Sequence, residues 1–195
     1  MFATSLRKIL ESESKDFYLH HQKQIIDILL FGSAVKGKET PQDLDLLIIF
    51  KEKKEYQLAQ ELKKSIQSRT KLNVEIILKT YEELFLENFI AREAILAESY
   101  SLLNKINFAA GFGYLTRVLF SYQLKGKTSS ERTRFYYALY GRGFKGVLEN
   151  LNAQKYAETV ILCPLENQMK MREFLESWKV EFKEISLLMP QRLVG

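Results

Sequence analysis

The sequence predicts an α/β (α+β) fold in two parts, an α/β unit over residues 1–105 and a smaller helical and α+β unit over residues 106–195. Two observations predict it. In the first part, short runs of Ile, Leu and Val alternate with segments whose apolar residues recur every three or four positions, as in strands alternating with helices. After about residue 106, glycines, aromatic residues and basic residues become closely spaced. This change of composition marks the expected domain boundary.

The first part is expected to open with an amphipathic helix, followed by strands rich in Ile and Leu, the first of which ends at Gly32. Thr80 and Glu83 match a capping box, which predicts a helix that starts there. In order, the expected elements are helix 1–17, strands 24–31 and 44–50, helix 56–68, strand 72–78, helix 80–98 and a short strand at 99–103.

The second part is expected to begin with a helical segment and to end as a small α+β unit. A helix over residues 130–140 would place Phe135, Ala138 and Leu139 on one apolar face, and the glycines after it would end this helix and start the next. In order, the expected elements are helices 111–124, 130–140 and 146–151, strand 158–163, helix 165–178 and strand 180–188.

Composition favours a globular protein over a disordered one or one that spans a membrane. The chain has 195 residues, of which 46% are apolar and 27% charged, and this balance is typical of a soluble globular protein. The net charge of +5 permits a partner that carries phosphate groups. No apolar run reaches the roughly 18 to 20 residues of a membrane span, and the single cysteine, Cys163, suits a reducing compartment. We therefore expect a cytoplasmic protein with no membrane partner and a buried structural thiol at Cys163.

Two aspartates, Asp43 and Asp45, lie at the start of an apolar run that should be buried. Since side chains alternate between the two faces of a strand, both carboxylates point the same way. Two like charges at one site repel each other unless a cation compensates them, and Mg²⁺ prefers such oxygen ligands. Glu75 is a third acid within an apolar strand, and it can join the pair if the two strands are neighbours. The expected cofactor is therefore Mg²⁺ or Mn²⁺, with these three carboxylates around it.

Gly32 and Ser33 follow the first strand directly. A glycine at this point lets the backbone approach a ligand closely, and free N–H groups and the serine hydroxyl can hold a phosphate if a helix begins there. Taken singly, a Gly-Ser pair after a strand is usually only a turn, and an Asp-x-Asp pair is usually solvated. Their order on consecutive strands, with an acid on the third, favours a site for a nucleoside triphosphate.

These residues resemble a known family. Gly32-Ser33, nine residues and then Asp43-Leu44-Asp45, followed by Glu75 on a later strand, are similar to the pattern of the nucleotidyltransferase superfamily related to DNA polymerase β, in its small archaeal and bacterial branch. The resemblance covers residues 24–103, and residues 134–146 with 160–164 are similar to a C-terminal extension of archaeal members. Many relatives have one more residue between the serine and the first aspartate, and many have Asp at the position of Glu75.

The resemblance implies a twisted mixed sheet backed by helices, with Asp43, Asp45 and Glu75 as metal ligands and catalytic residues. Gly32 and Ser33 would hold the β and γ phosphates of an incoming NTP, with ATP favoured. An acceptor hydroxyl would attack the α-phosphate and release pyrophosphate, and Glu75 would accept or orient its proton. The acceptor is left open between RNA, a protein hydroxyl and a small molecule, and the oligomeric state is left open as well.

Basic residues of the second part, Arg132, Arg134, Arg142 and Lys145, are interleaved with aromatic residues. Such a mixture is typical of a surface that binds single-stranded nucleic acid, through phosphates and base stacking. The alternative interpretation is a helix with an apolar core face and a solvated face that carries the arginines.

Two other functions are compatible with the same fold. Small relatives resemble antitoxins that pair with helical HEPN ribonucleases and either adenylylate or sequester them, although such antitoxins are usually shorter and have no extension of this length. A nucleic-acid-binding protein with a vestigial catalytic site is the third interpretation, against which the intact Asp43 and Asp45 count.

Overall fold

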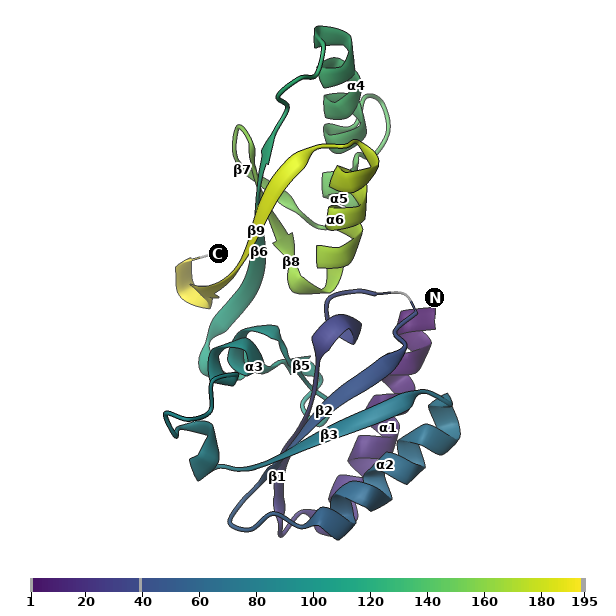
Figure 1. The fold of residues 1–195 in the computed structure, drawn as a ribbon, viewed down its shortest axis with the longest axis vertical. Helices are drawn as coiled ribbons and strands as arrows, with labels where there is room; N and C mark the ends of the chain where they lie inside the picture. Colours follow the sequence, from purple (N-terminus) through teal and green to yellow (C-terminus); the bar gives the residue numbers. More distant parts are fainter. Residues whose placement is uncertain (1, 39, 194–195) are drawn as a thin grey trace.

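A mixed five-stranded sheet forms the lower part of the molecule in Figure 1. The structure is a computed structural model that describes residues 2–38 and 40–193. The strand order is β3-β2-β1-β4-β5; β2 and β3 are parallel, and all other neighbours are antiparallel. The strands are β1 Ile25–Phe31, β2 Asp43–Phe50, β3 Asn73–Thr80, β4 Tyr100–Ser101 and β5 Ile106–Asn107. This mixed sheet and the helices that back it confirm the predicted fold class.

Helices cover both faces of this sheet because its inner strand β2, between β3 and β1, is apolar on both faces. α1 (Phe2–His21) and α2 (Tyr56–Thr70) cover one face, and their buried residues Leu10 and Leu62 belong to the same apolar cluster as Ile48. On the opposite face, Leu47 packs in a second cluster with Ile95 of α3 (Arg92–Glu98). We refer to the sheet with α1, α2 and α3 as the first lobe.

The second lobe is an antiparallel sheet with strand order β7-β8-β6-β9, and the helices labelled α4, α5 and α6 in Figure 1 cover one of its faces. Its core gathers around the Phe135 ring, whose centroid lies 5.4 Å from that of Tyr122 and 5.7 Å from that of Trp178. Its elements are β6 Tyr114–Gln123, α4 Ser129–Tyr140, α5 Val147–Asn150, β7 Gln154–Ala157, β8 Val160–Pro164, α6 Gln168–Ser177 and β9 Glu181–Pro190.

The helix predicted over residues 111–124 is wrong, because this segment forms the strand β6. Alternate side chains of β6, at Thr116, Val118, Phe120 and Tyr122, are buried, which is the period of a strand with one face on a core. These residues are also β-branched or aromatic, the types that favour strands. The alternation is visible in the sequence, and it outweighs the apolar content that suggested a helix.

The single helix predicted over residues 80–98 is also wrong. The capping box forms, since the Thr80 N–H donates to Glu83 Oε2 at 2.9 Å, but only a short 3₁₀ turn follows, and α3 begins at Arg92. Leu84 and Phe89 both pack against the sheet in the second apolar cluster. On one continuous helix these two side chains would point about 140° apart, so the chain must break to bury both.

The two lobes share one core. A single apolar cluster includes Val35 and Ile48 of the first lobe and Leu165 and Met171 of the second. The domain boundary at residue 105 stays a prediction, and β5, just after it, completes the sheet of the first lobe. Within residues 2–38 and 40–193, no helix combines the length and the apolar character that crossing a bilayer requires.

Candidate active site

The register of β2 and β3 places Asp45 directly beside Glu75. The two strands are parallel, so paired residues share a face of the sheet, and Asp43 lies two residues before Asp45 on that same face. Asp45 is partly buried, whereas Asp43 and Glu75 are exposed. The three acidic residues predicted from the sequence therefore occupy one face of two neighbouring strands.

Asp45 has an unfavourable electrostatic environment. Burial raises the pKa of its carboxyl group, and the negative charges of Asp43 and Glu75 raise this pKa further. Among the described residues, no hydrogen bond or ion pair compensates the carboxylate of Asp45. An ionised carboxylate without a partner is costly in such a position, so this group is suited to a cation that comes from outside the chain.

Gly32 brings the Gly-Ser turn against Asp45. Its φ is +75°, a conformation that glycine adopts readily, and a Cβ atom at this position would lie 2.3 Å from Asp45 Oδ2. Ser33 follows in a 3₁₀ turn over Gly32–Ala34. The sequence was compatible with the start of a helix at this point, but only this short turn forms. The turn is too short for a helix dipole, but its N–H groups and the serine hydroxyl are donors of the kind that bind phosphate oxygens.

The second lobe holds the loop that follows this turn. The N–H of Met169 donates to the carbonyl oxygen of Lys36 at 3.1 Å. At Gly37, where φ is +91°, a Cβ atom would lie 2.1 Å from the backbone oxygen of Glu166. Only glycine fits at position 37. The backbones of the two lobes are therefore in direct contact beside the candidate site.

The side chain of Lys36 also reaches across to α3. Its Nζ lies 2.6 Å from Oε2 of Glu98, and the hydroxyl of Ser186, on β9, donates to the other oxygen of the same carboxylate. Burial acts to raise the pKa of Glu98, but the hydrogen bonds from Lys36 and Ser186 together with the charge of Lys36 outweigh it and lower this pKa. The loop, α3 and β9 are thereby connected through one ionised carboxylate.

A divalent cation fits the donor chemistry of Asp43 and Asp45, because their charge lacks compensation and Mg²⁺ commonly takes one or two carboxylates, with waters and phosphate oxygens completing its shell. Within residues 2–38 and 40–193, no three His, Cys, Asp or Glu side chains are grouped closely enough to hold a metal ion. The charge of Glu75 acts on Asp45, yet the three carboxylates are not gathered as a ready-made ligand set.

Sequence reasoning missed Asp27, which lies in β1 on the same face as Asp45. Its carboxylate accepts hydrogen bonds from the N–H of Ile28 at 2.8 Å, the hydroxyl of Ser101 at 2.9 Å and the amide of Asn104 at 3.2 Å. Burial raises its pKa despite these bonds. An acid inside an apolar run was a visible signal here too. Lys36, Gly37 and Glu98 were missed because their contacts come from distant segments.

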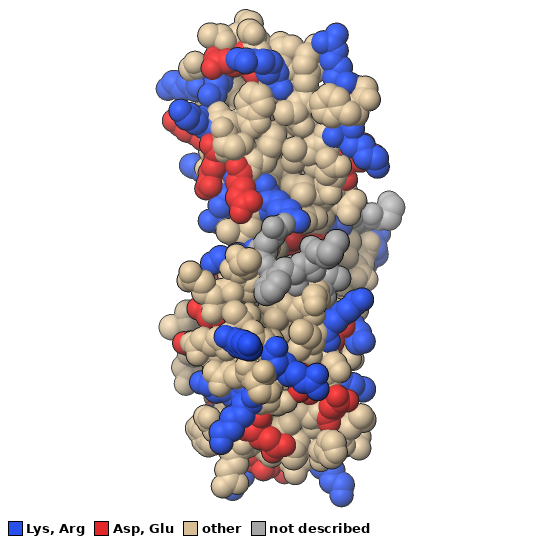
Figure 2. Space-filling model, turned by 90° about the vertical axis from the view of Figure 1, so that its right-hand side faces the viewer, with Lys and Arg blue, Asp and Glu red and all other residues tan. Residues whose placement is uncertain are grey.

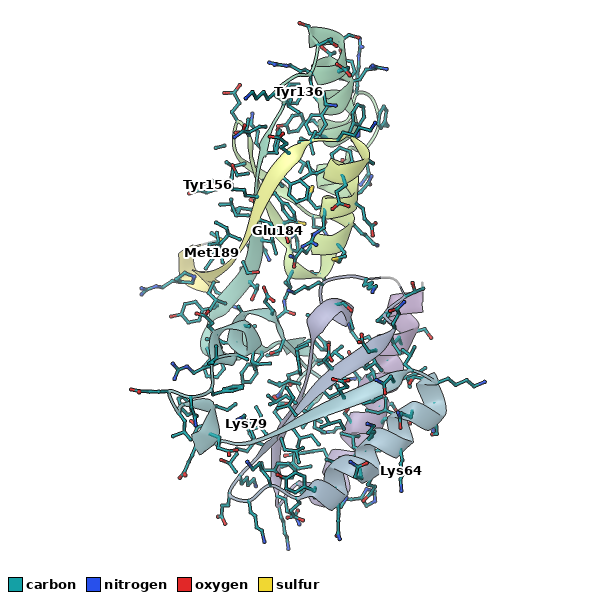
Figure 3. All side chains as sticks on the ribbon, viewed as in Figure 1. Lys64, Lys79, Tyr136, Tyr156, Glu184 and Met189 are labelled. Atoms are coloured by element: carbon teal, nitrogen blue, oxygen red, sulfur yellow. The ribbon has the colours of Figure 1, made fainter. Side chains whose placement is uncertain are left out.

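An apolar cavity of about 370 Å³ lies on this face of the sheet, away from the three carboxylates. Its walls are side chains of the sheet, of the segment between β3 and α3, of α3 itself, and of the segment that includes Phe108 and Tyr114. Lys79, on β3, reaches toward this segment (Figure 3), and its Nζ lies 4.7 Å from the centre of the Phe89 ring. None of the predicted site residues lines this cavity.

The predicted basic residues lie in the second lobe, on and after α4. Arg134, Arg142 and Lys145 line one shared cavity, whereas Arg132 does not line it and instead donates from Nε to the carbonyl oxygen of Lys127 at 3.1 Å. The core interpretation of α4 also holds, because Phe135 and Leu139 are buried. The helix thus has both an apolar inner face and a basic outer face.

Comparison with known proteins agrees with this geometry. No curated protein matches the sequence. Residues 15–101 match the family model described as polymerase beta, nucleotidyltransferase, and the matched segment contains both the Gly-Ser turn and the three acidic residues. Residues 15–101 therefore belong to the polymerase β nucleotidyltransferase superfamily.

Proposed function

We propose that this protein is a Mg²⁺-dependent nucleotidyltransferase. It moves an NMP unit from an NTP, with ATP as the favoured donor, onto a hydroxyl group of an RNA, a protein or a small molecule. The observation that carries the proposal is the position of Asp45. Its carboxylate is partly buried, lies near two further carboxylates and packs against Gly32. No Lys, Arg or His side chain among the described residues compensates its charge. The family of residues 15–101 supports the same type of chemistry.

In the proposed reaction, the acceptor oxygen attacks the α-phosphorus of the NTP. A new P–O bond forms, the bond to the leaving pyrophosphate breaks, and Glu75 accepts or orients the proton of the acceptor hydroxyl. The N–H groups of the Gly32 turn and the hydroxyl of Ser33 bind oxygens of the β and γ phosphates. When Mg²⁺ is bound, Asp43 and Asp45 hold it with Glu75 beside them, and it supplies positive charge to the triphosphate.

The test replaces both aspartates, as Asp43→Asn with Asp45→Asn. Wild-type protein and variant are incubated with each α-labelled NTP, with Mg²⁺ or Mn²⁺, against total RNA and against cell protein. We expect label to appear in one acceptor class with the wild type and to be lost by at least about a hundredfold in the variant, because the carboxylates act on the charge of the transition state. Circular dichroism should show the same secondary structure in both.

A matched control removes two acidic charges away from the site, as Glu82→Gln with Glu87→Gln, two exposed residues of the segment after β3. This control should transfer label as the wild type does. Undiminished transfer in the double aspartate variant, or no labelled product with any NTP and either metal, contradicts the proposal.

A further inference from the structure

A cavity of about 480 Å³ opens between α4, the glycine-rich loop after it and α5. It lies in the second lobe, outside the segment that matches the nucleotidyltransferase family. Most of its walls are basic or aromatic side chains, and Ala138, Val147 and Asn150 complete the lining. The basic residues are Arg134, Arg142 and Lys145, and the aromatic residues are Tyr137 and Phe144. The proposed transfer reaction uses none of these residues.

The aromatic residues of this cavity are exposed and do not contribute to the core of the second lobe. The Phe144 side chain is 65% exposed and that of Tyr137 is 37% exposed, whereas Phe135 and Leu139 already anchor α4 in the core. Large apolar rings left in water cost free energy and commonly mark a binding surface. The guanidinium of Arg142 lies over the Tyr137 ring, 4.6 Å from its centre, so a cation–π contact already exists in this cavity.

The charge around the cavity is positive. Residues 125–150 contain six basic residues and two acidic ones. One acid, Glu131, is engaged in the capping box of α4 with Thr128, and the other, Glu149, forms an exposed ion pair with Lys145 at 2.8 Å. In the part of the chain that the structure describes, neither Arg134 nor Arg142 forms an ion pair, although the charge of Arg134 acts on the nearby Glu131. Figure 2 shows Lys and Arg side chains at this end of the molecule, together with some Asp and Glu side chains and with uncharged surface between them.

The loop that carries these groups has a fixed shape. At Gly141, where φ is +92°, a Cβ atom would lie 2.1 Å from the backbone oxygen of Phe144, and at Gly146 it would lie 2.4 Å from the backbone carbon of Tyr140. The loop therefore closes on itself, backbone against backbone, between α4 and α5. Because its conformation is set before any ligand arrives, binding costs less conformational entropy.

We propose that this cavity is a binding site for single-stranded nucleic acid. Arg134 and Lys145 bind phosphates, and bases stack on Phe144 and on the Arg142–Tyr137 pair. Paired bases of a duplex are already stacked on each other, so they cannot use the rings, and the site favours single strands. An acidic protein or an anionic membrane would use the positive charges alone. Binding here is independent of the proposed transfer reaction.

The test measures fluorescence anisotropy of a labelled 15-nucleotide RNA, with single-stranded DNA and duplex DNA of the same sequence as further arms, on the full-length protein. We expect Arg134→Ala with Arg142→Ala to weaken binding of the RNA at least about tenfold and to reduce its salt dependence. Phe144→Ala should weaken it about tenfold with the salt dependence unchanged, and Phe144→Trp should restore it, because stacking depends on the ring and not on charge.

A matched control removes positive charge from the first lobe, as Lys53→Ala with Lys64→Ala, two exposed residues of which Lys64 lies on α2, far from α4 (Figure 3). Its affinity for RNA should stay within about twofold of the wild type. The double aspartate variant of the candidate active site should bind RNA as the wild type does, which separates this proposal from the proposed reaction.

The proposal is overturned if Phe144→Ala leaves the affinity unchanged, or if the Lys53 and Lys64 control weakens binding as much as the arginine variant. It is likewise overturned if duplex DNA, or vesicles with one third phosphatidylserine, bind as tightly as the single strand, since charge alone would then explain the interaction. Tighter binding of RNA than of single-stranded DNA, or the reverse, identifies the nucleic acid that the site takes.

Discussion

Burial and the charges of Asp43 and Glu75 raise the pKa of Asp45 above its ordinary value of 3.8. The folded protein therefore binds a proton at Asp45 at pH values where the unfolded chain has already lost it. The contribution of Asp45 to the free energy of unfolding therefore decreases as the pH rises above about 3.8. The decrease is complete once the pH exceeds the pKa of Asp45 in the folded state. At neutral pH, Asp45 favours unfolding, and a bound cation would reverse this effect.

Asp45→Asn should therefore stabilise the protein while it abolishes transfer of the NMP unit. We expect the free energy of unfolding at pH 7 to rise by up to about 1 kcal/mol, since the carboxylate is only partly buried. The gain should disappear near pH 3, where the carboxyl group is protonated in both states. Urea denaturation at the two pH values measures it, and a variant that is less stable than the wild type at pH 7 contradicts the interpretation.

At the scale of secondary-structure elements, the pairing of β2 with β3 sets the candidate site, and much of it was predictable. Asp43, Asp45 and Glu75 interrupt apolar runs of strand character, so their shared face follows from the two-residue period of a strand. The strand β6 was mistaken for a helix although its buried residues alternate. β7 was not predicted, because its four residues are all exposed and show no apolar pattern.

The network of Lys36, Glu98 and Ser186 could not be predicted, since its members come from a loop, the end of α3 and β9. Each is a common polar residue type in its own segment, and nothing in the sequence marks it as partly buried. Only the assembled fold shows that the three share one carboxylate, and that the loop after Ser33 is thereby fixed from two sides.

Glu98→Gln tests the role of this network. The pKa of Glu98 is lowered from its ordinary value of 4.5, so its stabilising contribution is present above that value and is lost as the pH falls through the lower pKa of the folded state. We expect about 1 kcal/mol less stability at pH 7, a difference that shrinks as the pH is lowered below 4.5, and slower transfer because the loop loses an anchor.

Glu83→Gln is the matched control, because Glu83 has a similar ion pair with Lys54, at 2.6 Å, far from the loop. It should leave transfer unchanged. Equal transfer rates in the Glu98 and Glu83 variants at pH 7 would show that the network does not position the loop.

At the scale of the whole molecule, the two lobes meet through backbone as well as side chains. Val35, Leu165 and Met171 belong to one apolar cluster, and Gly37 touches the backbone of Glu166. The composition of the sequence predicted two parts. It could not predict their contact, because a glycine in a charged loop is equally compatible with a solvated turn and with a tightly packed position.

Gly37→Ala should disrupt this contact. The added methyl group meets a backbone oxygen and the positive φ is unfavourable for alanine, so we expect a loss of about 2 to 4 kcal/mol and a matching loss of transfer. Gly113→Ala is the control, because Gly113 has a similar φ of +80° but open space around its Cβ position, and it should cost only about 1 kcal/mol. Equal losses in thermal or urea denaturation would refute the close packing at Gly37.

The contact at Gly37 limits how the two halves of the chain can diverge. Backbone packed against backbone has no rotamers with which to adapt, so a shift in the turn before α6 must be matched by a shift in the loop after Ser33. Chimeras that join the first half of this chain to the second half of a homologue should therefore assemble only when both junction loops are inherited together.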